Sequence, residues 1–138
     1  MLGVIVNPND LKDRIKQFAH RSVKLSSALP ATPLGKHIRL QLIKCSTSAA
    51  ANYRAACIAQ SRASFCSKLS IVVEETDESC FWMEFIITEK LLDPEKVADL
   101  LDEGRELTAI FVASRKTANN RSSEFIAAGQ TIVNYNSR

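Results

Sequence analysis

The residues that could carry metal or redox chemistry are four cysteines and two histidines. The cysteines are separated by 12, 9 and 14 residues, contain no C-x-x-C pair, and are Cys45, Cys57, Cys66 and Cys80. His20 and His37 each stand alone, outside any spacing typical of metal ligands. We therefore predict small, reduced, buried cysteines and no metal site, with a disulfide or metal site as the alternative.

Motifs of the common enzyme classes do not occur in this sequence. It holds no G-x-S-x-G elbow, no H-E-x-x-H helix and no glycine loop that could cradle a phosphate. A di-metal carboxylate bundle needs Glu-x-x-His motifs, and Glu75, Glu78 and Glu84 have no His three residues later. We predict no catalytic residues, no cofactor and no enzymatic activity.

Two polar clusters remain. Lys68, Glu75, Glu78 and Trp82 follow one another at spacings of 7, 3 and 4, which places them on one face of a helix. That face is either ion-paired and half-exposed, or a polar network at a helix or subunit interface. A second cluster is Ser46, Ser48 and Asn52, for which interhelical hydrogen bonding is the favoured role over a ligand pocket.

The elements that carry these residues are predicted to be four helices. Apolar residues recur at steps of three and four over about 10–29, 33–59, 61–88 and 94–118. Asn9 or Asp10 is the expected N-cap of the first segment, and Pro33 and Pro94 each stand at a first helical position. Short loops make consecutive helices antiparallel, so we predict an all-α, up-down-up-down four-helix bundle.

The whole chain, residues 1–138, is expected to form one domain. The apolar periodicity fades after Asn119, which predicts that residues 120–138 form a tail that is disordered or docks weakly. We see no signal peptide and no apolar run near the ~20 residues that a membrane helix needs. The expected location is the cytoplasm, without membrane contact.

Charge is distributed unevenly along the chain. Residues 1–68 hold 11 basic and 2 acidic residues, whereas residues 69–138 hold 7 basic and 13 acidic ones. Such asymmetry indicates an electrostatic partner, either another macromolecule or a second copy of the chain. Because successive helical residues turn by about 100°, charges of each sign gather on one outer face of a helix.

The basic outer face belongs to the second helix and consists of Lys36, Arg39, Lys44 and Arg54, with the apolar Leu40 and Ile43 among them. Arg62 joins this face only if the helix continues past Ala59. The acidic face belongs to the fourth helix and consists of Glu95, Asp99, Asp102, Glu103 and Glu106. These helices are diagonal in an up-down bundle, so the two faces predict head-to-tail subunit contacts, with simple solvated faces as the alternative.

Nucleic acid is the other partner that the basic half could bind. The candidate contacts are Lys12, Arg14, Lys16, Arg21, Lys24, Lys36, Arg39, Lys44 and Arg54. Such residues would neutralise phosphates and give salt-sensitive binding with little sequence preference. No aromatic residues alternate with them, so base stacking is not indicated.

Three runs of sequence resemble a known family. The run QLIKCSTSAAANYRAA (41–56) resembles the second helix of the bacterial four-helix-bundle proteins that are encoded in 23S rRNA intervening sequences. FCSKLSI (65–71), followed by Glu75, Glu78 and Trp82, resembles their third helix, and LTAIFVAS (107–114) resembles their fourth. The resemblance covers about residues 10–119. Ala50 and Glu74 stand where a glycine and a lysine are common.

The resemblance implies a homo-oligomer, typically a pentameric ring of bundles. It also implies kinship with the accessory variability determinant of diversity-generating retroelements, which binds nucleic acid and a reverse transcriptase. On this basis we expect a nonenzymatic binding module with RNA or DNA, or a ribonucleoprotein, as its further partner. The alternative is a protein scaffold or an accessory subunit, for example of a reverse transcriptase, that does not touch nucleic acid.

Overall fold

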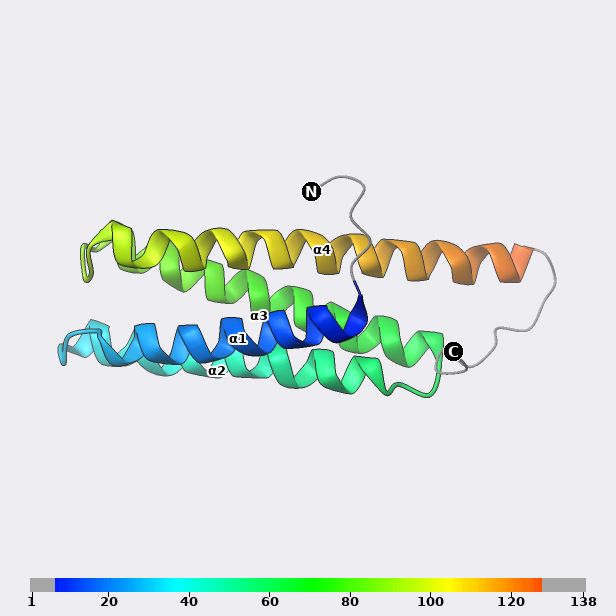
Figure 1. Ribbon diagram of the computed structural model, residues 1–138, viewed down its shortest axis with the longest axis horizontal. Coiled ribbons are helices and arrows are strands. Elements are labelled where there is room, and N and C mark those ends of the chain that lie inside the picture. The colour runs from blue at the N-terminus through cyan, green and yellow to red at the C-terminus, as the bar shows by residue number, and fades with distance from the viewer. Residues whose placement is uncertain (1–6, 128–138) are drawn as a thin grey trace.

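The computed structural model describes residues 7–127, with side chains described as far as residue 120. Its helices are α1 (Pro8–Ser27), α2 (Pro33–Cys57), α3 (Arg62–Thr88) and α4 (Pro94–Ala127). The α1–α2 and α3–α4 turns lie at one end of the molecule and the α2–α3 turn lies at the other (Figure 1). The predicted all-α, antiparallel four-helix bundle is confirmed.

Three helices begin at a side chain that accepts a backbone hydrogen bond. Asn7 accepts from the amide of Asn9 at 2.8 Å, Thr32 from Gly35 at 3.1 Å and Ser61 from Ser64 at 3.1 Å. These caps satisfy amides that have no partner in the first helical turn. The expectation that Asn9 or Asp10 caps α1 is wrong, because Pro8 is already the first helical residue.

Two predicted helix ends also differ from the structure. α2 ends at Cys57 rather than Ala59, so Arg62 is the first residue of α3 and does not extend the basic face of α2. α4 continues to Ala127, well past the predicted end at Ala118. No proline or glycine occurs between Gly104 and Gly129, so the helix persists after the apolar periodicity of the sequence fades. The predicted tail is therefore helical over 120–127, and 128–138 lie outside the described residues.

The α1–α2 turn requires a glycine. Gly35 lies in the first turn of α2, against the carbonyl group of Pro30, and an added Cβ would lie only 2.0 Å from that oxygen. The α3–α4 turn instead contains Lys90 with φ of 54°, a left-handed conformation that ends α3 before Pro94 starts α4. Both turns lie at the same end of the bundle (Figure 1).

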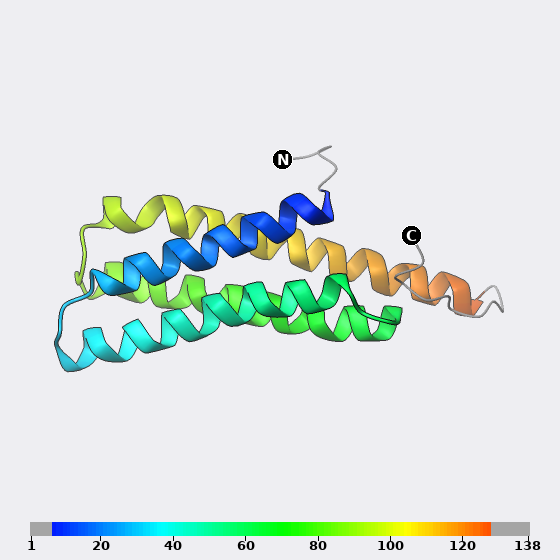
Figure 2. The same ribbon diagram turned by 60° about the horizontal axis from the view of Figure 1, so that its bottom comes forward.

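The core is continuous along the bundle and receives large side chains from every helix. Phe18, Leu42, Met83 and Phe111 are fully buried, one from each of the four helices. The seams between helices are unequal, however. α2–α3, α1–α2 and α3–α4 meet along most of their lengths, whereas α1 and α4 meet only over a short stretch, and α4 extends beyond the rest (Figure 2).

The charge asymmetry of the sequence becomes an asymmetry between two pairs of helices. α1 and α2 contain nine basic and two acidic residues, whereas α3 and α4 contain seven basic and eleven acidic ones. Because α2 meets α1 and α3 but not α4, α2 and α4 are diagonal as predicted. Between residues 7 and 127, no helix combines the length and the apolar character that crossing a membrane demands.

Candidate functional site

The outer face of α2 carries exposed basic side chains around an exposed apolar one. Lys36, Lys44 and Arg54 are exposed and form no salt bridge with any side chain described between residues 7 and 120. Leu40 lies among them with 67% of its surface exposed. Ile43, which we predicted as a second apolar contact, is half-buried. This arrangement fits a partner that is acidic and offers a small apolar area.

Arg39 does not belong to that free surface. Its guanidinium donates to the backbone carbonyls of Ser26 at 3.2 Å and Leu29 at 2.7 Å, so it closes the end of α1. Carbonyls at a helix C-terminus lack helical partners and carry partial negative charge, which favours a cation there. The sequence shows the charge of Arg39, but nothing in it marks these carbonyls as its partners.

The acidic face of α4 is divided in the same way. Glu95, Asp99 and Asp102 are exposed. Glu103 and Glu106 instead bind Arg14 of α1, with N–O distances of 2.6 Å and 3.3 Å. The hydrogen bond to Glu103 is the main cause that raises the pKa of the Arg14 guanidinium. Three predicted site residues thus form a clamp across the α1–α4 seam, inside one subunit.

The other predicted basic residues of α1 remain available. Lys16, Arg21 and Lys24 are exposed and Lys12 is half-buried, and none of them forms a salt bridge within the described part of the chain. On the neighbouring helix, Lys36 and Arg54 are exposed too. The basic surface that could meet an anionic partner is therefore α1 and α2 without Arg14 and Arg39.

The polar motif residues of α2 and α3 are half-buried or exposed, with Ser46 as the exception. Asn52 donates from Nδ2 to the carbonyl and hydroxyl oxygens of Ser48, at 2.9 Å and 3.1 Å. Lys68 and Glu75 are half-buried on α3. Burial is the first cause that raises the pKa of the Glu75 carboxyl; Glu78 raises it further, while Lys44 of α2 lowers it. Ser46 is buried and bonds the Ile43 carbonyl at 3.4 Å.

Glu78 and Trp82 of the predicted polar cluster belong to an aromatic cluster at the α2–α3 seam, whose other members were not predicted from the sequence. The Trp82 indole donates to Glu78 at 3.1 Å, and its ring lies 5.5 Å from His37, 4.9 Å from Phe81 and 6.0 Å from Phe85. Phe81 is 50% exposed. We call Glu78, Phe81, Trp82 and Phe85 the aromatic patch. The run Phe81-Trp82 was a visible signal, because a large aromatic pair cannot point into the core together.

The cysteines offer little chemistry. Burial raises the pKa of Cys45 and of Cys80 to about 11, so both remain thiols at neutral pH. The Ser79 hydroxyl donates to Cys45 Sγ at 3.1 Å. Cys57 and Cys66 are half-buried, and burial raises their pKa as well. Among the described residues, no group of three or more His, Cys, Asp or Glu side chains could hold a metal ion.

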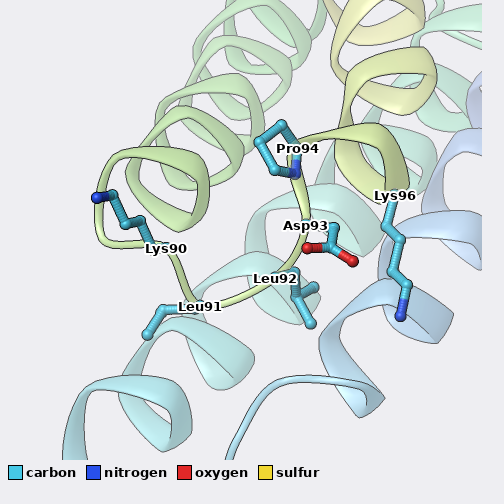
Figure 3. Close-up of a pocket in the computed structure, with 6 residues that line it drawn as sticks. All are labelled: Lys90, Leu91, Leu92, Asp93, Pro94 and Lys96. Atoms are coloured by element: carbon cyan, nitrogen blue, oxygen red, sulfur yellow. The ribbon is translucent and has the colours of Figure 1, made fainter.

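The turn between α3 and α4 forms an open depression lined by six residues, which Figure 3 shows as Lys90, Leu91, Leu92, Asp93, Pro94 and Lys96. The two lysine ammonium groups point away from each other (Figure 3). A catalytic or anion-binding site needs polar groups that converge on one point. The polar groups of this depression do not converge on one point, so we assign its residues to the turn alone.

Comparison with known proteins identifies a solved structure with the same fold. It is the crystal structure of a protein of unknown function from the S23 ribosomal protein family of Bacteroides thetaiotaomicron. The two chains are 30% identical, with a TM-score of 0.72, and the match covers 77% of this chain and 98% of the other. No protein-family model and no curated protein matches this sequence.

Proposed function

This chain belongs to the S23 ribosomal protein family, and we propose that it is a nonenzymatic binding module that assembles with copies of itself. One observation carries the proposal: Leu40, 67% exposed, stands between the unpaired Lys36 and Lys44 on a bundle whose other two helices are acidic. An apolar centre edged by charged side chains is the composition that many protein contact surfaces share.

The two faces of opposite charge favour a head-to-tail contact. The basic face of α2 on one subunit meets the acidic α3–α4 side of the next, where the exposed carboxylates are Glu74, Asp77 and Glu78 of α3 and Glu95, Asp99 and Asp102 of α4. A contact between unlike faces repeats from subunit to subunit, and it closes into a ring when the rotation allows. The resemblance of the three sequence runs to intervening-sequence proteins is consistent with the further proposal of a ring of five subunits.

The mass of the particle in solution tests this proposal. Light scattering at micromolar concentration and low salt should give one defined oligomer of more than two subunits. Lys44→Glu should weaken assembly, because it places a carboxylate opposite an acidic face. Lys24→Glu on α1 is the matched control, equal in charge change but outside the proposed contact. A monomeric wild-type protein under these conditions refutes the proposal.

Nucleic acid is the second candidate partner. The observation in its favour is the nine-to-two excess of basic residues on α1 and α2, of which Lys16, Arg21 and Lys24 are exposed and outside the proposed subunit contact. Fluorescence anisotropy with a structured RNA and a DNA duplex should show binding that falls steeply between about 50 and about 200 mM salt, because binding through phosphate contacts weakens as salt rises.

A charge reversal separates the two candidates. Arg21→Glu with Lys24→Glu should weaken nucleic-acid binding and leave the oligomer intact, because these residues lie on α1. If the oligomer forms and no nucleic acid binds at either salt concentration, the protein is a scaffold or an accessory subunit, for example of a reverse transcriptase. That result would leave self-assembly as the proposed function.

A further inference from the structure

Only two large apolar side chains are exposed on α3 and α4 in the described part of the chain. They are Phe81, 50% exposed, and Val112, 40% exposed. The exposed acidic residues of the α4 face, Glu95 to Asp102, lie in the first turns of the helix, ten or more residues before Val112. If Leu40 of one subunit is covered by another subunit, its apolar counterpart among these residues is Phe81.

The charges around Phe81 match those around Leu40. Glu74, Asp77 and Glu78 precede it on α3, and all three are exposed. None of them forms a salt bridge with any side chain described in this chain. Lys36 and Lys44 flank Leu40, and they too form no salt bridge with any side chain described in this chain. Two apolar centres, each edged by exposed charges of opposite sign, are complementary surfaces.

The two surfaces also lie at the same height along the bundle. His37 of α2 touches Trp82 of α3, and Cys45 of α2 meets Ser79 of α3. Leu40 lies between His37 and Cys45 on one helix, and Phe81 lies between Ser79 and Trp82 on the other. Subunits arranged about an axis parallel to their bundles contact one another at equal height, so Leu40 can meet Phe81 without any shift along the bundle.

Register and ring closure both favour α3 over α4 as the partner of α2. Arg105 of α4 pairs with Glu84 of α3 at 3.0 Å, which places Asp99 and Asp102 nearer the end of the bundle than Phe81. Outward directions of neighbouring helices differ by about 90° in a four-helix bundle, and those of diagonal helices by about 180°. A ring of four or five subunits needs contact faces about 90° to 108° apart, whereas opposed faces produce an open chain.

The side chains of the patch also contact one another within one chain. Glu78 fixes the Trp82 indole at 3.1 Å, and His37, Phe81 and Phe85 pack around that ring. A fixed aromatic surface loses little side-chain entropy when it binds, which is why such residues dominate interface energies. We infer that the aromatic patch on α3 receives the Leu40-centred face of α2 from a second copy of the chain. The inference rests on the proposed self-assembly and names its contact.

Single substitutions at exposed positions test the contact. Leu40→Asp and Phe81→Asp should each weaken self-association by about thirtyfold or more, as loss of a central interface residue does. Ile58→Asp and Val112→Asp are matched controls, because both residues are exposed and apolar but lie outside the contact. Far-UV circular dichroism should show the same helical content for all four variants.

Mixing the two defective variants gives a sharper test. Leu40→Asp retains an intact aromatic patch, and Phe81→Asp retains an intact α2 face. At a concentration where each variant alone is monomeric, an equimolar mixture should form a one-to-one dimer that cannot grow. A mixture that stays monomeric overturns the inference, because an intact α2 face and an intact aromatic patch would then fail to bind each other.

A charge exchange distinguishes α3 from α4. Lys44→Glu should be rescued by Glu74→Lys on α3 and not by Asp99→Lys on α4, with the particle mass as the readout. Rescue by Asp99→Lys alone, or an oligomer that survives Phe81→Asp, overturns the inference and leaves self-assembly standing. A wild-type monomer overturns the proposed function and the inference together.

Discussion

Gly35→Ala is expected to destabilise the bundle even though alanine is the better helix former. Gly35 lies in the first turn of α2, where the exchange alone would stabilise a helix by up to about 1 kcal/mol. The new Cβ, however, would lie 2.0 Å from the Pro30 carbonyl oxygen and 3.0 Å from its carbon. Favourable separations are about 3.5 Å or more, so the α1–α2 turn must move as a whole.

Overpacking of this kind costs about 1–3 kcal/mol and sometimes more, and the obstacle here is backbone rather than a side chain that can rotate. We expect a net loss of about 2 kcal/mol in the free energy of unfolding. Urea unfolding followed by circular dichroism measures it, at one protein concentration because assembly adds to apparent stability. Gly104→Ala should lose less, since its neighbours are the ends of Cys80 and Phe18. An alanine variant at position 35 as stable as wild type would refute the steric argument.

Three further outcomes follow from side-chain environments. Arg14→Met and Glu103→Gln should each lower the unfolding free energy by about 1 kcal/mol, and a double-mutant cycle should show a coupling that weakens with salt. In the native protein, Cys57 and Cys66 should react with a thiol reagent faster than Cys45 and Cys80, whose pKa is about 11. The reaction is measured at about pH 8, near the pKa of a free thiol. Equal rates for all four thiols would contradict the burial of Cys45 and Cys80. Glu75→Gln should raise stability at neutral pH, because folding raises the pKa of Glu75 and its ionisation opposes folding. That advantage should vanish as pH falls below about 4, where glutamate is protonated in both states, and a gain that persists there would have another cause.

Local sequence signals predicted the helices well because each signal acts within one helical turn. Thr32 with Pro33 and the Asp93-Pro94 pair mark helix starts that the structure retains. The predicted end of α4 was wrong because it was placed where the apolar periodicity fades, and a helix without proline or glycine continues beyond that point. Burial pattern and helix length are thus separate properties of a sequence.

The candidate site was harder to predict, because its residues acquire partners through tertiary structure. Arg14 binds a carboxylate 89 residues away, and Arg39 binds carbonyls 13 and 10 residues away. A helical projection shows that such side chains point away from the core, but it does not show which neighbouring helix they contact. The aromatic patch was missed for the converse reason, since its importance depends on the exposure of Phe81 and on contact with His37.

The narrow α1–α4 seam has a consequence for the order of folding. The three broad seams join helices that are consecutive in the chain, so each can form as a local helical hairpin, which is fast. Closure between α1 and α4 brings together residues 89 apart, as Arg14 and Glu103 are, and gains only a short contact. This seam should therefore close after the rate-limiting step, and losing the Arg14 clamp should speed unfolding while leaving the folding rate nearly unchanged.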